Sequence, residues 1–215
     1  GKDYRILNLA DDKDEEKRNL YLTACLLVFF QQQKLFQDKK SEFSPYLIEN
    51  PLWVFVGGSV ISAGSKKDVS DVMDIIFFLS NFVKNRAKSE EFLNRLLSRK
   101  SGLLDSHNHD IFFNAFRYLD ECGYTASVLF DDILRTIFNS PSAGLVYMEN
   151  LKGADGEIAL MLGDNKPFGL INVGDPNKLC NLCEKHNEIV VKIRDFSGSL
   201  FNTLNDSESK INILI

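Results

Sequence analysis

"GLVYMENLKGADGEIALMLGDNKPFGLINV" (residues 144–173) decides the fold, because its apolar residues recur with a period of two. Three short apolar runs are separated by KGADG and GDNKP, which are clusters of Gly, Asp, Asn and Pro typical of tight turns. Consecutive strands joined by turns this short pair antiparallel. The stretch therefore predicts a three-stranded antiparallel β-meander.

Strand and helix patterns alternate after the meander. PNKLCNLCEKH predicts a helix, EIVVKI a strand, SGSLFNTLN a second helix and INILI a last strand. Alternation of this kind indicates right-handed βαβ units and a parallel sheet. Upstream, the apolar run of residues 52–56 lies between a proline and two glycines, which predicts a fully buried strand of the same sheet.

The rest of the chain has helical patterns. Residues 14–37 carry apolar side chains on more than one face, which predicts a buried helix. A long helix is expected after the caps Asp68 or Ser70, and shorter helices are expected near residues 92–97, 111–119 and 128–138. The fold class predicted is α/β, with an inserted segment made of helices and the meander.

Composition narrows the class of protein. Of the 215 residues, 44% are hydrophobic, which is enough for a large core. The longest near-apolar run, residues 24–30, is shorter than the roughly 20 residues of a membrane span, and no signal peptide is recognised. Four cysteines without a secretory signal favour reduced thiols and a cytoplasmic protein that does not interact with membranes.

The net charge of −5 bears on nucleic-acid binding. Proteins that bind nucleic acid on their own usually carry a basic surplus. Any such role here is expected to be local, or shared with residues outside this chain.

Both ends of the chain suggest a longer parent protein. Gly1 stands where a start methionine is expected, and the chain stops on the strand INILI. A core strand needs neighbours for its backbone and an outgoing connection. We therefore expect an excised piece of a longer chain.

A glycine-rich segment, GGSVISAGSKK, follows the first predicted strand. A P-loop needs four residues between its glycines and a Lys followed by Ser or Thr. Here five residues separate Gly58 from Gly64, and Ser65 precedes Lys66. The nucleotide-binding interpretation fails. Contact with a backbone phosphate through N–H groups, Ser59 and Lys66 remains open beside an ordinary strand-to-helix connection.

Three residues of CNLCEKH suggest a zinc site. Cys180, Cys183 and His186 supply three of about four ligands, and no second CxxC completes them. Two cysteines three residues apart share one helix face, where they pack as small hydrophobic residues. Packing in the core is the stronger prediction, and no metal site is expected.

Two further clusters resemble catalytic groups. His107, His109 and Asp110 lie between helical patterns without a nucleophile or a further ligand, so a solvated loop with Asp as a cap is predicted. Asp120 and Glu121 imitate the acidic motif of ATP-driven motors, but they end a helix instead of following a strand. DGE at residues 155–157 is turn chemistry. No catalytic residue is predicted.

Three phrases carry a resemblance to a known family. They are YLIENPLWVFVGGSV, LKGADGEIALMLGDNKPFGLINVGD and DFSGSLFNTLNDSESKINILI. Together they resemble superfamily-2 DEAD/DEAH-box helicases close to the Res subunit of type III restriction systems. The likeness runs from about residue 4 to residue 215 and includes no ATPase motif.

The resemblance implies a domain organisation. Residues 46–68 and 165–215 would form most of the second RecA-like lobe, a mainly parallel sheet with helices on both faces. Residues 1–45 would be a helical lead-in. Residues 69–164 would be a helical and β-hairpin insertion.

The resemblance also implies a function. The parent protein would be an ATP-dependent helicase or translocase, in which ATP and Mg bind through motifs outside this chain. This fragment would have no cofactor of its own and would be inactive alone. Its partners would be the first helicase lobe of the same chain and nucleic acid, expected to be DNA although RNA stays open.

Two loops are the expected nucleic-acid contacts. Each follows a parallel strand at the ligand-facing edge, where small hydroxyl residues and free N–H groups suit phosphate contacts. The candidate residues are Gly57, Gly58, Ser59, Lys66, Phe196, Ser197 and Ser199. The alternative for the two later serines is N-capping of the helix SLFNTLN.

A second function stays open, that of an α/β protein-interaction module without motor chemistry. The net negative charge favours it, and the inserted helices would supply the docking surface. Their phenylalanines are Phe77, Phe78, Phe112, Phe113 and Phe116. Exposure of these side chains would indicate a surface for a partner.

Overall fold

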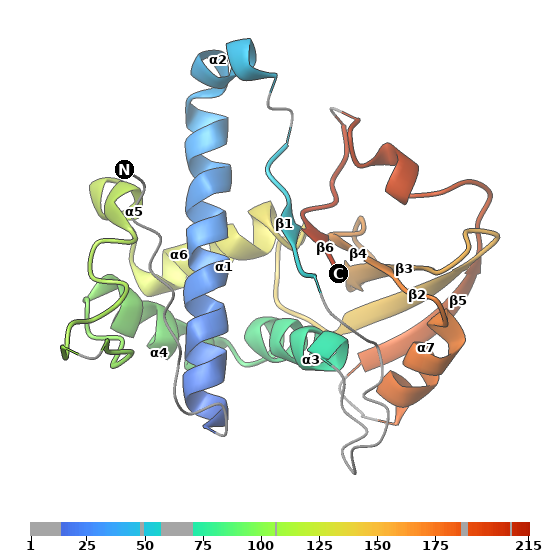
Figure 1. Ribbon diagram of the computed structural model, residues 1–215, viewed down its shortest axis with the longest axis horizontal. Coiled ribbons are helices and arrows are strands. Elements are labelled where there is room, and N and C mark those ends of the chain that lie inside the picture. The colour runs from blue at the N-terminus through green and yellow to red at the C-terminus, as the bar shows by residue number, and fades with distance from the viewer. Residues whose placement is uncertain (1–13, 48–49, 57–70, 106, 186–188, 207) are drawn as a thin grey trace.

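A computed structural model describes residues 14–47, 50–56, 71–105, 107–185, 189–206 and 208–215. Its six strands form one sheet in the order β1-β6-β4-β3-β2-β5 (Figure 1). The strands are β1 (Trp53–Val54), β2 (Val146–Lys152), β3 (Glu157–Leu162), β4 (Gly169–Asn172), β5 (Ile189–Asp195) and β6 (Ile213–Leu214).

Of the described α-helices, two precede β1 in sequence, four lie between β1 and β2, and α7 connects β4 to β5. The α-helices are α1 (Glu15–Asp38), α2 (Lys40–Phe43), α3 (Asp71–Lys84), α4 (Arg86–Leu97), α5 (Arg117–Glu121), α6 (Ala126–Thr136) and α7 (Pro176–Glu184). Two 3-10 helices are η1 (Ser44–Tyr46) and η2 (Phe201–Thr203). The molecule has a helical side and a sheet side, with α7 beside β2 and β5 (Figure 1).

The predicted meander is confirmed. β2 pairs antiparallel with β3, and β3 pairs antiparallel with β4, so the three strands are adjacent in the sheet. The β2–β3 turn uses Gly153 and Gly156 at φ values of 97° and 79°, which L-residues with side chains rarely adopt. A Cβ on Gly153 would lie 2.5 Å from the carbonyl oxygen of Phe196, so this turn also needs glycine for its close contact with the chain after β5.

The predicted parallel relations are also found. β5 pairs parallel with β2, and β6 pairs parallel with both β4 and β1. Because β2 and β4 both oppose β3, only β3 runs against the other five strands. The protein therefore has an α/β fold built on a mixed sheet in which most strands share one direction.

One face of the sheet packs on the helices. Alternate residues of the meander point to this face, for example Met148, Leu160 and Ile171. They join a single hydrophobic cluster with buried residues of α1, α3, α4, α6 and α7. The cluster contains residues from all three segments of the expected domain organisation. The boundary expected after residue 164 falls between the paired strands β3 and β4. Burial of this area is the main stabilising term of the fold.

The opposite face has a different cover. Leu151, Ala154 and Ala159 form a second small cluster, against which Phe196 and Leu200 pack. These two residues belong to the segment after β5, in which η2 is the one helical turn among the described residues. Within the described part of the chain, the expectation of helices on both faces is therefore fulfilled on one face only. Because both covers exist, all six residues of β3 are buried.

Two sequence predictions need correction. Strand β1 has only two residues and pairs with β6 alone among the described strands, so Val54 is 48% exposed rather than fully buried. A compact apolar run does not distinguish an edge strand from a central one. The helix expected in SGSLFNTLN is reduced to the single turn η2, and a buried carboxylate from β3 accepts from the N–H groups at its start.

The other helices agree with expectation except at one place. α1 begins after the N-cap Asp14 and buries apolar residues on several faces, as predicted. The helix expected over residues 111–119 is instead a series of turns followed by the short α5. Asp110 accepts a hydrogen bond from the Phe112 N–H at 2.9 Å, which stabilises a turn in place of a helix.

Candidate functional site

The carboxyl edge of the sheet gathers the loops most suited to binding a ligand. β2, β4, β5 and β6 all end at this edge, and the β2–β3 turn lies there as well. In open α/β sheets, ligands bind outside the carboxyl ends of the strands. The segment after β5, which contains Phe196, Ser197 and Ser199, is at this edge as the sequence predicts.

For the other predicted loop, only the strand that precedes it is among the described residues. Gly57, Gly58, Ser59 and Lys66 lie outside them. The chain is described up to Val56, which follows β1 and is 94% exposed. β1 and β5 occupy opposite ends of the strand order, which corresponds to about 24 Å at the usual strand spacing. The structure thus brings the ends of these two strands to one edge without making them neighbours.

Phe196 anchors the loop after β5. Its N–H donates to the carbonyl oxygen of Lys152 at 2.9 Å, which continues the β2–β5 ladder by one bond. Its ring packs on the small apolar cluster, and the guanidinium carbon of Arg194 lies 5.7 Å from the ring centroid. Phe196 therefore has a structural role that accounts for its contacts.

Ser199 is bound within the protein. Its Oγ donates to the Oε1 of Glu157 and accepts from the N–H of Asn202 at 3.2 Å. The second carboxylate oxygen of Glu157 accepts from the N–H groups of Leu200 and Phe201 at 2.8 and 3.3 Å. Ser199 thus accepts from an N–H in the first turn of η2, whose N-cap position is Leu200, and this contact favours the capping alternative for Ser199.

Ser197 and Gly198 remain the exposed part of the loop. Neither N–H donates to an acceptor in the described part of the chain, and the same holds for the Ser197 hydroxyl. Gly198 has a φ of 121°, so the backbone here takes a conformation that favours glycine. Adjacent free N–H groups and a hydroxyl are the donors that phosphate oxygens accept.

Two basic residues lie beside this loop. Lys152 ends β2 opposite Asp195, and it makes no ion pair with the described residues. Arg194 precedes the loop and contacts Glu149 at 3.3 Å across β2 and β5. Sequence reasoning missed both residues. The available signal was their position one or two residues after a predicted strand, where side chains reach the ligand-facing edge.

The N-terminus of α7 also faces this edge, but its own sequence satisfies it. Asp175 accepts a hydrogen bond from the N–H of Lys178 at 2.9 Å and so acts as the N-cap. Asn150 of β2 donates to Asn177 at 2.9 Å. The helix start is therefore bound to its own carboxylate and to the sheet.

The cysteine cluster lies in the core. Cys180 and Cys183 are buried in the main hydrophobic cluster, which confirms the predicted packing role. Burial raises the pKa of Cys180 to about 11 and that of Cys183 to about 12, which disfavours the thiolate that zinc requires. His186 lies outside the described residues. All four cysteines of the chain are free thiols.

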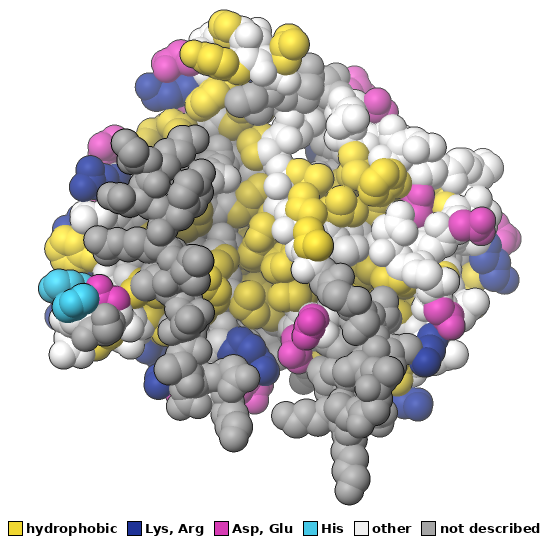
Figure 2. Space-filling model, in the orientation of Figure 1, with side chains coloured by type: hydrophobic (Ala, Val, Ile, Leu, Met, Phe, Trp, Pro, Cys, Tyr) yellow, Lys and Arg dark blue, Asp and Glu magenta, His cyan; other side chains and the backbone are white. Residues whose placement is uncertain are grey.

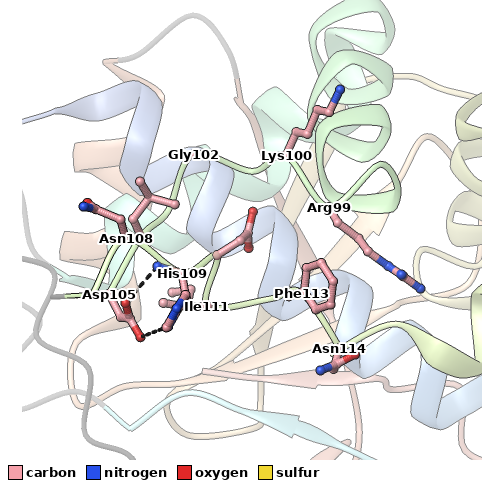
Figure 3. A pocket seen from close by; sticks show the side chains of 11 residues that line it. Arg99, Lys100, Gly102, Asp105, Asn108, His109, Ile111, Phe113 and Asn114 are labelled. Atoms are coloured by element: carbon pink, nitrogen blue, oxygen red, sulfur yellow. Dashed lines mark hydrogen bonds and ion pairs between the residues drawn. The ribbon is translucent and has the colours of Figure 1, made fainter.

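The histidine cluster borders a cavity of about 800 Å³ on the helical side (Figure 3). Asp105 accepts hydrogen bonds from the N–H groups of His107 and His109 at 2.8 and 2.9 Å, and these bonds lower its pKa. Asp110 accepts from the N–H and Oγ of Ser101, both at 2.7 Å. Both carboxylates therefore shape the loop, as expected for Asp in a solvated turn.

Charge at the rim of this cavity is partly neutralised. Arg99 lies over the ring of Phe113 at 5.1 Å and pairs with Asp120 at 2.9 Å.

The remaining acidic candidates lie where the sequence predicts. Asp120 and Glu121 end the short α5, and Asp155 lies in the β2–β3 turn. Among the described residues, no three His, Cys, Asp or Glu side chains come close enough to hold a metal ion.

No described helix has the length and apolar character needed to cross a membrane. Comparison of the chain with family models, curated proteins and solved structures gave no match.

Proposed function

We propose that this chain is most of the second RecA-like lobe of an ATP-dependent nucleic-acid helicase or translocase of the type III restriction Res kind. In this proposal ATP and Mg bind to motifs of the parent protein outside the chain. The sheet provides the edge that contacts the nucleic-acid backbone. The chain alone is then inactive as an ATPase.

The observation that carries the proposal is the loop after β5. Ser197 and Gly198 present donors without a described acceptor at the carboxyl edge, and Lys152 lies at the end of the neighbouring strand. Such donors bind phosphates without reading bases, which suits movement along a strand of any sequence. Phe196 and Ser199 contribute by anchoring this loop.

The mechanism proposed is a cycle of lobe closure and release. Closure of the first lobe on ATP would bring the edge near Ser197 against a backbone phosphate. Hydrolysis would release the closed state and let this lobe take the next phosphate along the strand. The residues of this chain supply grip and orientation in that cycle, while the bond-breaking groups belong to the rest of the parent.

Salt-dependent binding tests the proposal. Binding of the chain to a fluorescent single-stranded DNA, and to the matching RNA, would be followed by anisotropy at several salt concentrations. Lys152→Gln is expected to reduce the slope of log affinity against log salt by about one, as for loss of one phosphate contact. Lys66→Gln is expected to do the same.

Lys40→Gln is the matched control, because Lys40 is an exposed lysine on α2 with no ion pair to the described residues. It is expected to leave the slope unchanged. Affinity that does not depend on salt, or an equal loss in Lys40→Gln and Lys152→Gln, would contradict the proposed contact. ATP hydrolysis by the chain alone would contradict its proposed place in the parent.

A protein-interaction module remains the second candidate, and the exposure of Phe113 favours it. Phe113 is 51% exposed beside the helical-side cavity, whereas Phe78 and Phe116 are buried in the core. Apolar side chains are also exposed over η1 and β1 (Figure 2). A test of this candidate must therefore change Phe113, because changing Phe116 would damage the core itself.

Phe113→Asp is expected to prevent capture of a partner while leaving oligonucleotide affinity unchanged. The measurement is recovery of bound proteins on immobilised chain, compared between wild type and the variant. Loss of oligonucleotide binding in Phe113→Asp, with partner capture intact, would exclude this second candidate.

A further inference from the structure

A cavity of about 530 Å³ lies at the amino edge of the sheet, opposite the edge discussed above. It is formed where the chain enters β1, β4 and β6 and where α6 ends. The lining side chains that matter for the argument are Arg135, Asn139, Asn165, Lys166, Lys210 and Asn212. No function discussed so far uses this cavity.

Carboxamide side chains fix the walls of the cavity. Asn212 Nδ2 donates to the carbonyl oxygens of Thr136 and Ile137 at 3.0 and 2.9 Å. Asn139 Nδ2 donates to the carbonyl oxygens of Pro167 and Lys210, both at 2.8 Å. Each side chain joins two segments far apart in sequence, so the walls are held by hydrogen bonds rather than by apolar packing.

Other side chains that line the cavity are also held by hydrogen bonds. Gln33 of α1 is buried, and its Nε2 donates to the carbonyl oxygen of Pro51 at 2.7 Å. Asn165 Nδ2 donates to the carbonyl oxygen of Leu162 and to Ser140 Oγ at 2.6 and 3.1 Å. A polar wall anchored at this many points is preorganised for a ligand.

The charge of the lining has one sign. Arg135, Lys166 and Lys210 are cationic, and no aspartate or glutamate is among the described residues that line the cavity, although the chain has a net charge of −5. Arg135 pairs with Asp132 at 2.7 Å through one guanidinium nitrogen. Lys166 and Lys210 have no ion pair within the described residues. Two ammonium groups that have no ion pair in the described part of the chain therefore face a polar cavity.

The C-terminus of α6 does not repel an anion in this cavity. The C-terminal carbonyls of a helix carry partial negative charge. The carbonyl oxygens of Thr136 and Ile137 are already bound by Asn212, and Arg135 lies in the last turn of the helix. These contacts offset the negative end of the helix at the cavity.

We propose that this cavity binds a phosphate group, with Lys166 and Lys210 as the charged ligands and Arg135 and the carboxamides completing the site. Among the described lining residues, Pro141 alone has an apolar side chain, and none of them has an aromatic ring to stack on a base. The ligand class is therefore a phosphate or sugar phosphate. The source is either a free small molecule or the backbone of a nucleic acid.

The test is a titration of the 215-residue chain, by calorimetry and by amide chemical shifts, with inorganic phosphate, pyrophosphate and ribose 5-phosphate. Saturable binding is expected at about 10 mM ligand or below. Lys166→Gln and Lys210→Gln are each expected to weaken it about tenfold, as for loss of one charge-assisted hydrogen bond. The shifted amides are expected near residues 139–140, 165–166 and 209–212.

Lys100→Gln is the matched control, because Lys100 lines the other cavity and also has no described ion pair. It is expected to leave the affinity unchanged. Absence of saturable binding by the three small ligands and also by a single-stranded oligonucleotide would overturn the proposal, and so would the same loss in Lys100→Gln. Shifts spread over the whole surface would also overturn it.

A single-stranded oligonucleotide separates the two sources. If ribose 5-phosphate binds in the cavity by itself, the site takes a free sugar phosphate. If only the oligonucleotide gives the predicted shifts and loses affinity in Lys166→Gln, the phosphate belongs to a strand. This test is independent of the proposed function, because Lys152→Gln affects the opposite edge of the sheet and is expected to leave this cavity unchanged.

Discussion

The two faces of the sheet are covered in different ways. The face toward the helices is apolar and joins one large cluster, to which most of the helices contribute. The other face has three buried apolar residues in its cluster, and its covering segment is held by the carboxylate of Glu157. The first cover depends on area removed from water, and the second depends on a few directional bonds.

This difference places the candidate contact on the less densely anchored side. Ser197 belongs to the segment that covers the second face, so its position depends on Glu157 and on the fit of Gly153 against Phe196. Segments with few apolar contacts open at lower free energy than the core. The loop can therefore adjust to a ligand without disturbing the helical side.

Removing a core ring should have the largest effect. Phe138 is fully buried, and its ring centroid lies 4.9 Å from that of Phe168 and 6.0 Å from that of Phe82. Phe138→Ala is expected to lower the free energy of unfolding by about 3–5 kcal/mol through lost burial and a cavity. Denaturant unfolding measures it. Phe113→Ala, at an exposed ring, should cost about 1 kcal/mol or less.

Removing the buried carboxylate should come next. Glu157→Ala leaves the hydroxyl of Ser199 and two backbone N–H groups without their acceptor and is expected to cost about 3 kcal/mol. Hydrogen exchange should rise at residues 199–203 before it rises in the helices. Glu157→Gln retains an acceptor oxygen and should recover most of the loss. Equal damage in both variants would mean that the cover depends on the second acceptor oxygen and the negative charge, both of which glutamine lacks.

The glycine turn gives a smaller effect on the same side. Gly153→Ala puts a Cβ 2.5 Å from the Phe196 carbonyl oxygen at a φ of 97°, and about 2 kcal/mol is expected. Gly174→Ala is the control, since nothing lies within 4 Å of its added Cβ. Thermal unfolding compares the two. Similar stability in both variants would show that the turn moves freely away from the loop after β5.

Removing an ion pair at the surface of the helical side should have the smallest effect on stability. Arg86 of α4 binds Asp131 of α6 through two nitrogens at 2.7 and 3.1 Å, and this contact lowers the pKa of Asp131. Asp131→Asn is expected to cost about 0.5 kcal/mol at neutral pH. Because the folded pKa is lowered, the contribution is present above the unfolded pKa and is lost as pH falls through the folded one.

Unfolding curves of wild type and Asp131→Asn at several pH values measure this effect. The two proteins should converge as the pH falls through the lowered folded pKa of Asp131, because the carboxyl is then protonated in both states. A difference that stays constant down to about pH 2 would show that packing, rather than charge, explains the cost. Such a result would weaken the contrast between the small stabilisation from a solvent-screened surface ion pair and the larger one from the hydrogen bonds of the buried Glu157.

The sequence by itself determined the local elements of this protein. Alternating apolar residues between two turn clusters specify the meander, and the packing role of Cys180 and Cys183 follows from their helical spacing. The alternation of strand and helix patterns placed Phe196, Ser197 and Ser199 after a parallel strand. These predictions succeeded because they depend on neighbours in sequence, which periodicity and turn chemistry report directly.

Only the tertiary structure decided what each element meets. It placed β1 at the edge, reduced SLFNTLN to η2, and gave the hydroxyl of Ser199 to Glu157 from 42 residues away in sequence. It also joined Asn139, Lys166 and Lys210 around one cavity. Such contacts join residues distant in sequence, and no local pattern encodes which distant partner satisfies a given polar group or covers a given strand.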